Sequence, residues 1–187
     1  MKGLARISLV TLSALLVLSG LCGCGGTTPV AVSNKAPSTA PTMSGETELP
    51  FETVEFVGND VGGSYREREP RLVVVTTRQE IDRIEGLVSS ETLAQLKELD
   101  FQQYFVIGLY RGSRGSSGYA TIIERIARRE DKIVVYAQFW EPSPHYVVFD
   151  TVTSPYHLVK VRKERGMSEE TKVVLNPRVV TPTPPFR

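Results

Sequence analysis

A chain of 187 residues with 41% hydrophobic and 23% charged side chains has an ordinary globular composition, and its length favours one domain with extensions. Its 22 basic and 21 acidic side chains nearly cancel, so we expect no nucleic-acid partner. Both cysteines, Cys22 and Cys24, fall in the N-terminal apolar segment. This placement excludes disulfides and thiolate metal sites from the rest of the chain, and we expect no cofactor.

Residues 1–23 have the three parts of a secretory signal peptide. Lys2 and Arg6 form a positive start, an apolar run follows over residues 7–18, and small residues come next. The apolar run is shorter than the roughly 20 residues that a membrane-spanning helix needs. We therefore predict a cleaved export signal and an extracytoplasmic protein.

The signal ends in Leu21-Cys22-Gly23-Cys24, which resembles the bacterial lipobox of an aliphatic residue, two small residues and a cysteine. Cys22 at a small-residue position is the one departure from that pattern. The resemblance implies that the Cys24 thiol carries a diacylglyceryl group, so that membrane lipid is the first partner. The alternative is simple cleavage nearby and a free secreted protein.

Two segments without hydrophobic periodicity flank one folded region. Residues 25–49 are rich in Gly, Ser, Thr, Pro and Ala, which predicts a flexible linker, so residues 24–49 would comprise the lipid anchor that the lipobox resemblance implies and this linker. Residues 181–187 form a Pro-rich tail. The domain between them is predicted to cover residues 50–180.

The first half of this domain is predicted to contain strands and two helices. Residues 52–57 alternate, and Leu72 to Val75 is a β-branched run, so both are predicted strands. Thr77-x-x-Glu80 has the form of a capping box and predicts a helix start. A second helix is expected from Ser90.

The second half is predicted to be β-structure. Three strands, at 104–110, 119–126 and 133–140, are expected to form an antiparallel meander. Further strands are expected at 146–149, 156–161 and 172–175. The fold class is therefore α+β: a mainly antiparallel sheet with two helices packed on it.

No motif in the chain indicates an enzyme. The segment Gly112–Gly118 is rich in Gly and Ser, yet it lacks the Gly-Lys-Ser/Thr ending of a phosphate-binding loop and lies between two predicted strands. It also lacks the Gly-x-Ser-x-Gly elbow of a serine nucleophile. His145 and His157 have no evident carboxylate partner. We expect a non-enzymatic protein.

Several residues are candidates for contact with a protein partner. Trp140 and Tyr146 flank Pro142 and Pro144, and exposed Trp and Tyr are favoured interface anchors. The preceding loop adds further candidates, and a strand added to a free sheet edge is a second mode of contact. The candidates in that loop are Arg111, Arg114, Ser117, Gly118 and Tyr119.

The stretch Gly108 to Lys163 resembles the C-terminal domain of the protease complex subunit PrcB family. The resemblance rests on Gly108-Leu-Tyr-Arg-Gly112 with Ser117-Gly-Tyr119, on Ile133-Val-Val-Tyr-Ala-Gln138, and on Thr153-Ser-Pro-Tyr156 before a strand. It implies a lipoprotein or secreted protein that associates with a protease complex and helps it form or persist. It implies no catalytic residues.

Two other functions stay open. Ser116-Ser-Gly-Tyr119 is faintly similar to the Asn-Pro-Thr-Thr-Gly-Tyr loop of chagasin-type cysteine protease inhibitors, although Arg114 and Gly115 replace the Asn-Pro half. A module that binds a cell-envelope glycan would instead show exposed aromatics around a groove, with Trp140 among them.

Overall fold

The structure, a computed structural model, describes residues 45–58, 64–165, 167 and 171–182. The predicted signal peptide, Cys24 and most of the predicted linker lie outside these residues, as does the tail from residue 183. Within the described part of the chain, no helix is long and apolar enough to cross a membrane.

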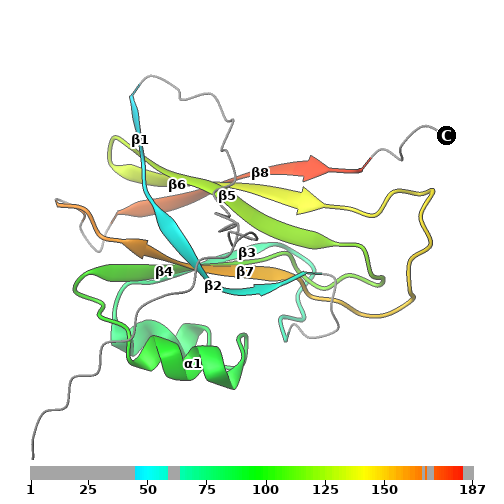
Figure 1. The fold of residues 1–187 in the computed structure, drawn as a ribbon, viewed down its shortest axis with the longest axis horizontal. Helices are drawn as coiled ribbons and strands as arrows, with labels where there is room; N and C mark the ends of the chain where they lie inside the picture. Colours follow the sequence, from blue (N-terminus) through cyan, green and yellow to red (C-terminus); the bar gives the residue numbers. More distant parts are fainter. Residues whose placement is uncertain (1–44, 59–63, 166, 168–170, 183–187) are drawn as a thin grey trace, which may run out of the picture. The chain divides into compact units, whose positions relative to one another are not determined.

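The described residues form two four-stranded sheets and two short helices (Figure 1). Sheet A has the strand order β1-β5-β6-β8, and sheet B has the order β2-β7-β4-β3. Neighbouring strands are antiparallel except β6 and β8, which are parallel. The elements are β1 (Glu46–Glu48), β2 (Phe51–Val57), β3 (Arg71–Val75), the 3-10 helix η1 (Arg78–Arg83), α1 (Ser90–Lys97), β4 (Tyr104–Tyr110), β5 (Ala120–Arg129), β6 (Lys132–Trp140), β7 (Tyr156–Arg162) and β8 (Lys172–Val180).

The predicted single sheet is wrong, because the strands divide between two sheets. The expected meander is broken after β4: β5 pairs with β6, whereas β4 pairs with β3 and β7 in the other sheet. The loop at 111–119 is longer than a tight hairpin turn, so it carries the chain from sheet B to sheet A. The predicted antiparallel pairing of β5 with β6 is confirmed.

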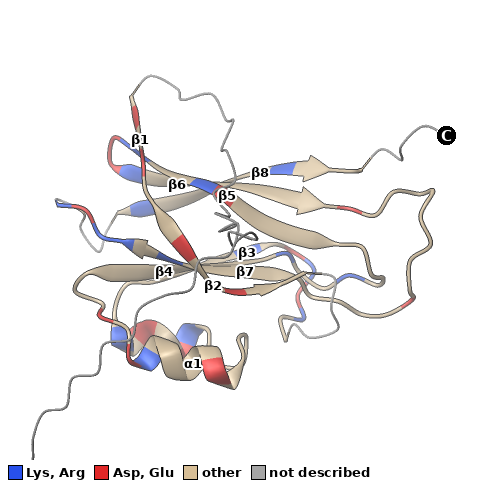
Figure 2. Cartoon of the chain, in the orientation of Figure 1, with Lys and Arg blue, Asp and Glu red and all other residues tan. Residues whose placement is uncertain are grey.

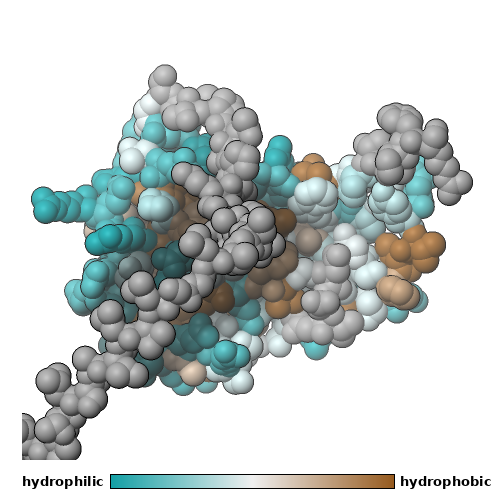
Figure 3. All heavy atoms as spheres, viewed as in Figure 1, coloured by the Kyte–Doolittle hydropathy of each residue, from teal (hydrophilic) through white to brown (hydrophobic). Residues whose placement is uncertain are grey.

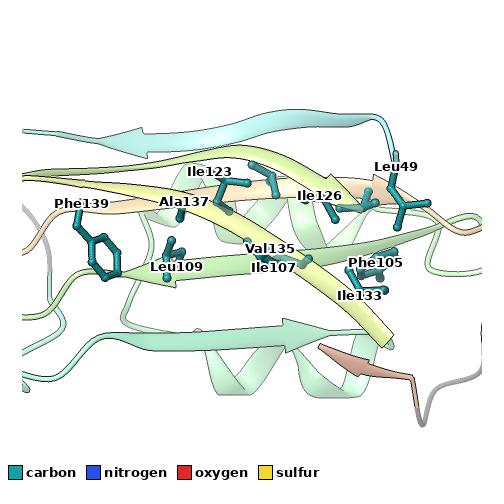
Figure 4. Packing of buried hydrophobic residues seen from close by; sticks show 12 residues of the cluster. Leu49, Phe105, Ile107, Leu109, Ile123, Ile126, Ile133, Val135, Ala137 and Phe139 are labelled. Carbon is teal, nitrogen blue, oxygen red and sulfur yellow. The ribbon is translucent and has the colours of Figure 1, made fainter. Parts of the chain in front are cut away.

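Sheet B is the middle layer of the domain, between sheet A and the helices (Figure 1). Strand β4 is buried from Phe105 to Tyr110, which explains its unbroken apolar run. Alternate side chains of β4 and β7 face sheet A and join the inner face of β6, where Ile133, Val135, Ala137 and Phe139 lie (Figure 4). The opposite side chains of sheet B pack against η1 and α1, so each face of this sheet has its own core.

Only one of the two predicted helix starts has the expected cap. Helix α1 begins after Ser89, whose hydroxyl accepts a hydrogen bond from the Thr92 N–H at 3.1 Å. Thr77 makes no side-chain cap, and the helix that follows it is a short 3-10 helix. Glu80 instead accepts hydrogen bonds from the backbone N–H and the hydroxyl of Thr76. The predicted capping box of Thr77 with Glu80 is therefore wrong, because the partner of Glu80 is the residue before Thr77.

The folded part begins before residue 50, inside the segment predicted to be a linker. Strand β1 pairs with the end of β5, and Leu49 is fully buried and donates its backbone N–H to Ile126 O at 2.8 Å. After Pro50 the chain continues as β2 of sheet B. The chain thus crosses from sheet A to sheet B at Leu49 and Pro50.

A buried ion pair fixes β1. Glu46 accepts hydrogen bonds from Arg125 at 2.9 Å and from the Tyr136 hydroxyl at 2.6 Å, and the Arg125 guanidinium lies 3.9 Å from the centre of the Tyr136 ring. The side chains of Glu46 and Arg125 are only 2% and 7% exposed. The bond from Tyr136, followed by that from Arg125, holds the pKa of Glu46 below its ordinary value against the effect of burial.

Candidate partner-binding surface

Two long loops leave the sheets at the same end of the domain. The register pairs Tyr110 with Tyr156 and Ala120 with Trp140, so the segments 111–119 and 141–155 both begin and end there. We call this the loop end. The opposite end, where Glu46 pairs with Arg129, is called the tether end because the chain enters the domain there.

Hydrogen bonds join the two loops. Arg114 and Thr153 exchange backbone hydrogen bonds at 2.8 and 2.9 Å, and the Thr153 hydroxyl donates to Ser116 O at 3.0 Å. Ser117 donates its N–H to Phe149 O at 2.9 Å, and its hydroxyl accepts the Phe149 N–H at the same distance. These bonds fix the second loop at Phe149 and Thr153.

Two glycines allow this close approach. Gly118 has φ of +92°, and a Cβ at this position would lie 2.8 Å from Cβ of Pro142. Gly112 has φ of +90°, and its Cβ would lie 2.3 Å from Arg68 O. Side chains at these positions would strain the backbone and collide with the neighbouring segment. Gly118 therefore belongs to the framework of the loop end.

The two predicted contact arginines are also part of this framework. Arg111 is buried, with its guanidinium 2.8 Å from Glu141 and 4.3 Å from the centre of the Phe139 ring. Burial, followed by the neighbouring Arg114, lowers the pKa of Arg111 from its ordinary value. Arg114 donates to the carbonyl oxygens of Arg68, Ser113 and Arg111. Both cations are thus held by groups of the domain itself.

The second loop exposes a run of large apolar side chains. Val147 is 97% exposed and Phe149 is 77% exposed, while Tyr146, Val148 and Val152 are exposed to a lesser degree. The predicted strand at 146–149 is wrong, because this segment lies outside both sheets. We call Tyr146–Val152 the apolar loop.

The apolar loop is part of a wider apolar end. Among the described residues, the exposed large hydrophobic side chains lie either in this loop or near the ends of β2 and β8. Both of these strands also end at the loop end. Hydrophobic atoms gather at the same end in Figure 3, on the right. They are Phe56, Tyr146, Val147, Val148, Phe149, Val152 and Val179.

The charge of the second loop is acidic. Over residues 141–153 its charged side chains are Glu141 and Asp150, and no Lys or Arg is present (Figure 2). Glu141 pairs with Arg111, whereas exposed Asp150 makes no ion pair with the described residues. The nearby segment Arg66–Glu69 alternates cations and acids and adds no net charge.

The remaining predicted site residues also lie at the loop end. Tyr146 is 46% exposed, whereas Trp140 and Tyr119 are half-buried. The indole N–H of Trp140 is buried and has no hydrogen-bond partner in the described structure. The fold therefore brings the predicted residues together, but most of them support the surface and are not exposed on it. The most exposed residues of that surface, Val147 and Phe149, were not predicted from the sequence.

Both free edges on one side of the domain are protected against strand addition. The backbone N–H of Glu141 donates to Val180 O, so the backbone groups of residue 180 face β6. Because these groups alternate in direction along a strand, those of residue 177 face the free edge, where Pro177 has no N–H to donate. On β3, Arg83 donates to Val74 O at 3.4 Å. Proline and charged side chains on an edge disfavour pairing with another strand.

The histidines and acids do not form a constellation with evident chemistry. His157 is buried, and both its ring nitrogens have partners, Ile123 N–H at 2.9 Å and the Thr53 hydroxyl at 2.9 Å. His145 is exposed in the second loop. Within the described ranges no group of three or more His, Cys, Asp or Glu side chains is placed to hold a metal ion.

A small cavity of about 210 Å³ opens near the tether end, between β3 and β8. Its floor is apolar, with Phe105 and Ile133, and its polar groups are already bonded. Lys163 donates to the carbonyl oxygens of Thr76 and Phe101, and Arg83 pairs with Glu80. Among the described residues that line this cavity, no unpartnered polar group marks it as a binding site.

Taken together, the fold and the loop end define a domain of two packed sheets that presents an apolar loop at one end. Residues 105–162 match the PrcB C-terminal family, so this part of the chain is a PrcB C-terminal domain, as the resemblance predicts. The match runs from within β4 to the end of β7 and includes both loops. No curated protein matches the chain. No solved structure matches it either.

Proposed function

We propose that this protein is a non-enzymatic, lipid-anchored accessory subunit of an extracytoplasmic protease complex. The lipid on Cys24 would hold it at a membrane, the linker would give it reach, and the domain would bind the partner. Anchoring raises the concentration of the domain near a partner at the same membrane.

The observation that carries this proposal is the combination of the family match with the apolar loop. The matched residues 105–162 include the whole of the Tyr146–Val152 segment and the loop that supports it. Apolar patches on a monomer surface are typical of protein contacts. The PrcB family name in turn favours a protease complex as the setting.

A pull-down from solubilised native membranes tests the proposal, with the full lipidated protein as bait and Cys24→Ala as the matched variant. We expect the lipidated bait to recover a protease and the variant to recover much less of it. Recovery of no protease, or of envelope glycan alone, would contradict the proposal and favour a glycan-binding module.

The same preparation separates an accessory subunit from a chagasin-type inhibitor. An accessory subunit raises the yield or lifetime of active protease, so protease activity in membranes that lack this protein should fall. An inhibitor would block the recovered protease when added in stoichiometric amount, and activity in membranes without it should rise. We expect the first result.

A further inference from the structure

We infer that the apolar loop Tyr146–Val152 inserts into the binding partner. This partner is a protein with an apolar groove bordered by Lys or Arg. This inference rests on the proposed function and adds the surface and its chemistry. The groove would receive Val147 and Phe149, the most exposed apolar side chains of the described residues, and its basic border would meet Asp150.

The apolar loop is held in place before any partner binds. Its base is fixed at Phe149 by two hydrogen bonds with Ser117 and at Thr153 by the paired bonds with Arg114. Ser154 donates its hydroxyl to Tyr65 O at 2.7 Å, and Pro155 O accepts the Arg111 N–H. Because the backbone is already ordered, little conformational entropy is lost on binding. On the other side of Phe149, Tyr146 donates its N–H to Ser143 O at 3.0 Å, and the side chains of Val147 and Phe149 stay exposed.

The predicted tether joins the domain at the end opposite the apolar loop. It enters at Gly45, and β5 spans the ten residues between the two ends, or about 33 Å.

The charge of the loop disfavours lipid as its partner. Glu141 and Asp150 are the charged residues of the second loop, and the cations beneath it, Arg111 and Arg114, are occupied by Glu141 and by carbonyl oxygens. Segments that bind anionic membrane surfaces are instead rich in exposed Lys and Arg. The same acids disfavour a symmetric pair of apolar loops, which would bring two copies of Asp150 together.

In-cell photo-crosslinking of the full lipidated protein tests this inference. A benzophenone amino acid is placed at Val147 or Phe149, and for comparison at Gln95 in α1, which is exposed and lies outside the apolar end. We expect a single protein crosslinked through positions 147 and 149 only, and crosslinked peptides that place apolar residues and a Lys or Arg at the contact.

The companion variants are Val147→Asp and, as the control outside the apolar end, Gln95→Asp in α1. Both put the same charge at an exposed position, so neither should disturb the core. We expect Val147→Asp to reduce co-purification of the crosslinked protein at least tenfold and Gln95→Asp to leave it within twofold. Crosslinks to lipid alone, or to a second copy of this chain, would overturn the inference, as would equal loss in both variants.

The two proposals fail separately. If the loop crosslinks to a protein that is neither a protease nor in a complex with one, the surface is confirmed and the protease setting is wrong. If a protease is recovered by the wild-type bait and equally by Val147→Asp, the protease setting stands and the surface is wrong.

Discussion

At the residue scale, His157 connects the two sheets. Its Nδ1 accepts the Ile123 N–H from sheet A, so Nε2 carries the proton and donates to the Thr53 hydroxyl of sheet B. Ile123 and Thr53 lie at the register shifts of β5 and β2, so the imidazole bonds to the irregular part of each strand. Burial lowers the pKa of His157 to about 4.

This lowered pKa predicts a loss of stability in mild acid. Between pH 6.5 and about 4 the unfolded chain binds a proton at His157 that the folded domain does not, so the free energy of unfolding falls as the pH falls. The shift corresponds to about 3 kcal/mol. Urea unfolding of the wild type and of His157→Asn, which cannot titrate, measures the effect.

We expect the wild type to lose stability from pH 6.5 to 5, and the variant, although less stable throughout, to lose clearly less over the same interval. This window lies above the ordinary pKa of glutamate, so Glu46 and Glu80, whose pKa values are lowered, lose their contribution only at more acid pH. Parallel curves for the two proteins would contradict the assignment.

Gly118 and Gly115 offer a matched test of the loop framework. We expect Gly118→Ala to cost about 1–3 kcal/mol, because alanine would take a φ of +92° and press on Pro142. At Gly115 nothing lies within 4 Å of a new Cβ and the φ is not positive, so Gly115→Ala should change the free energy of unfolding by less than about 0.5 kcal/mol. Equal urea midpoints for the two variants would argue against a tight contact at Gly118.

At the element scale, the short strand β1 depends on one buried carboxylate. Glu46→Gln keeps the shape of the side chain but leaves the Arg125 guanidinium buried without its counter-ion, which costs about 3–5 kcal/mol in comparable sites. Hydrogen exchange at Leu49, whose N–H bonds to Ile126, should then accelerate. Glu48→Gln, on the same strand but exposed, is the control and should leave this exchange unchanged.

The strands themselves could be predicted from sequence, because each carries its own pattern. Leu72 to Val75 and the Ile133-to-Phe139 alternation gave correct positions for β3 and β6. The division into two sheets could not be predicted, because it depends on where the loop at 111–119 leads the chain. The long β8 was also underestimated: Pro177 argues against a central strand but is tolerated on an edge.

The exposed apolar loop was predictable only in outline. Trp140 and Tyr146 pointed to the end of the domain that carries it, because aromatics beside prolines indicate an exposed segment. Tyr146–Phe149 has the composition of a buried strand, and composition alone does not show that no neighbouring strand pairs with it. Conversely, Arg111 has the character of a contact residue, but the fold buries it against Glu141 and Phe139.

At the scale of the whole molecule, the tether end and the loop end differ in what they present. The tether end receives the chain through β1, whereas the exposed large apolar side chains of the described residues gather at the loop end. If Cys24 carries a lipid and the apolar loop binds a protein, we expect the tether end to lie nearer the bilayer than the loop. A fluorophore on Thr47→Cys should be quenched more by spin-labelled lipid than one on Val147→Cys in the full lipidated protein. Stronger quenching at position 147 would mean that the loop faces the bilayer.

The measurement that tests the proposed function and its surface most directly is the membrane pull-down with three full lipidated baits: wild type, Val147→Asp and Gln95→Asp. We predict that the wild type and Gln95→Asp recover a protease and that Val147→Asp recovers at least tenfold less of it. Absence of a protease from all three preparations would contradict the proposed function, and equal recovery by all three would contradict the role of the apolar loop.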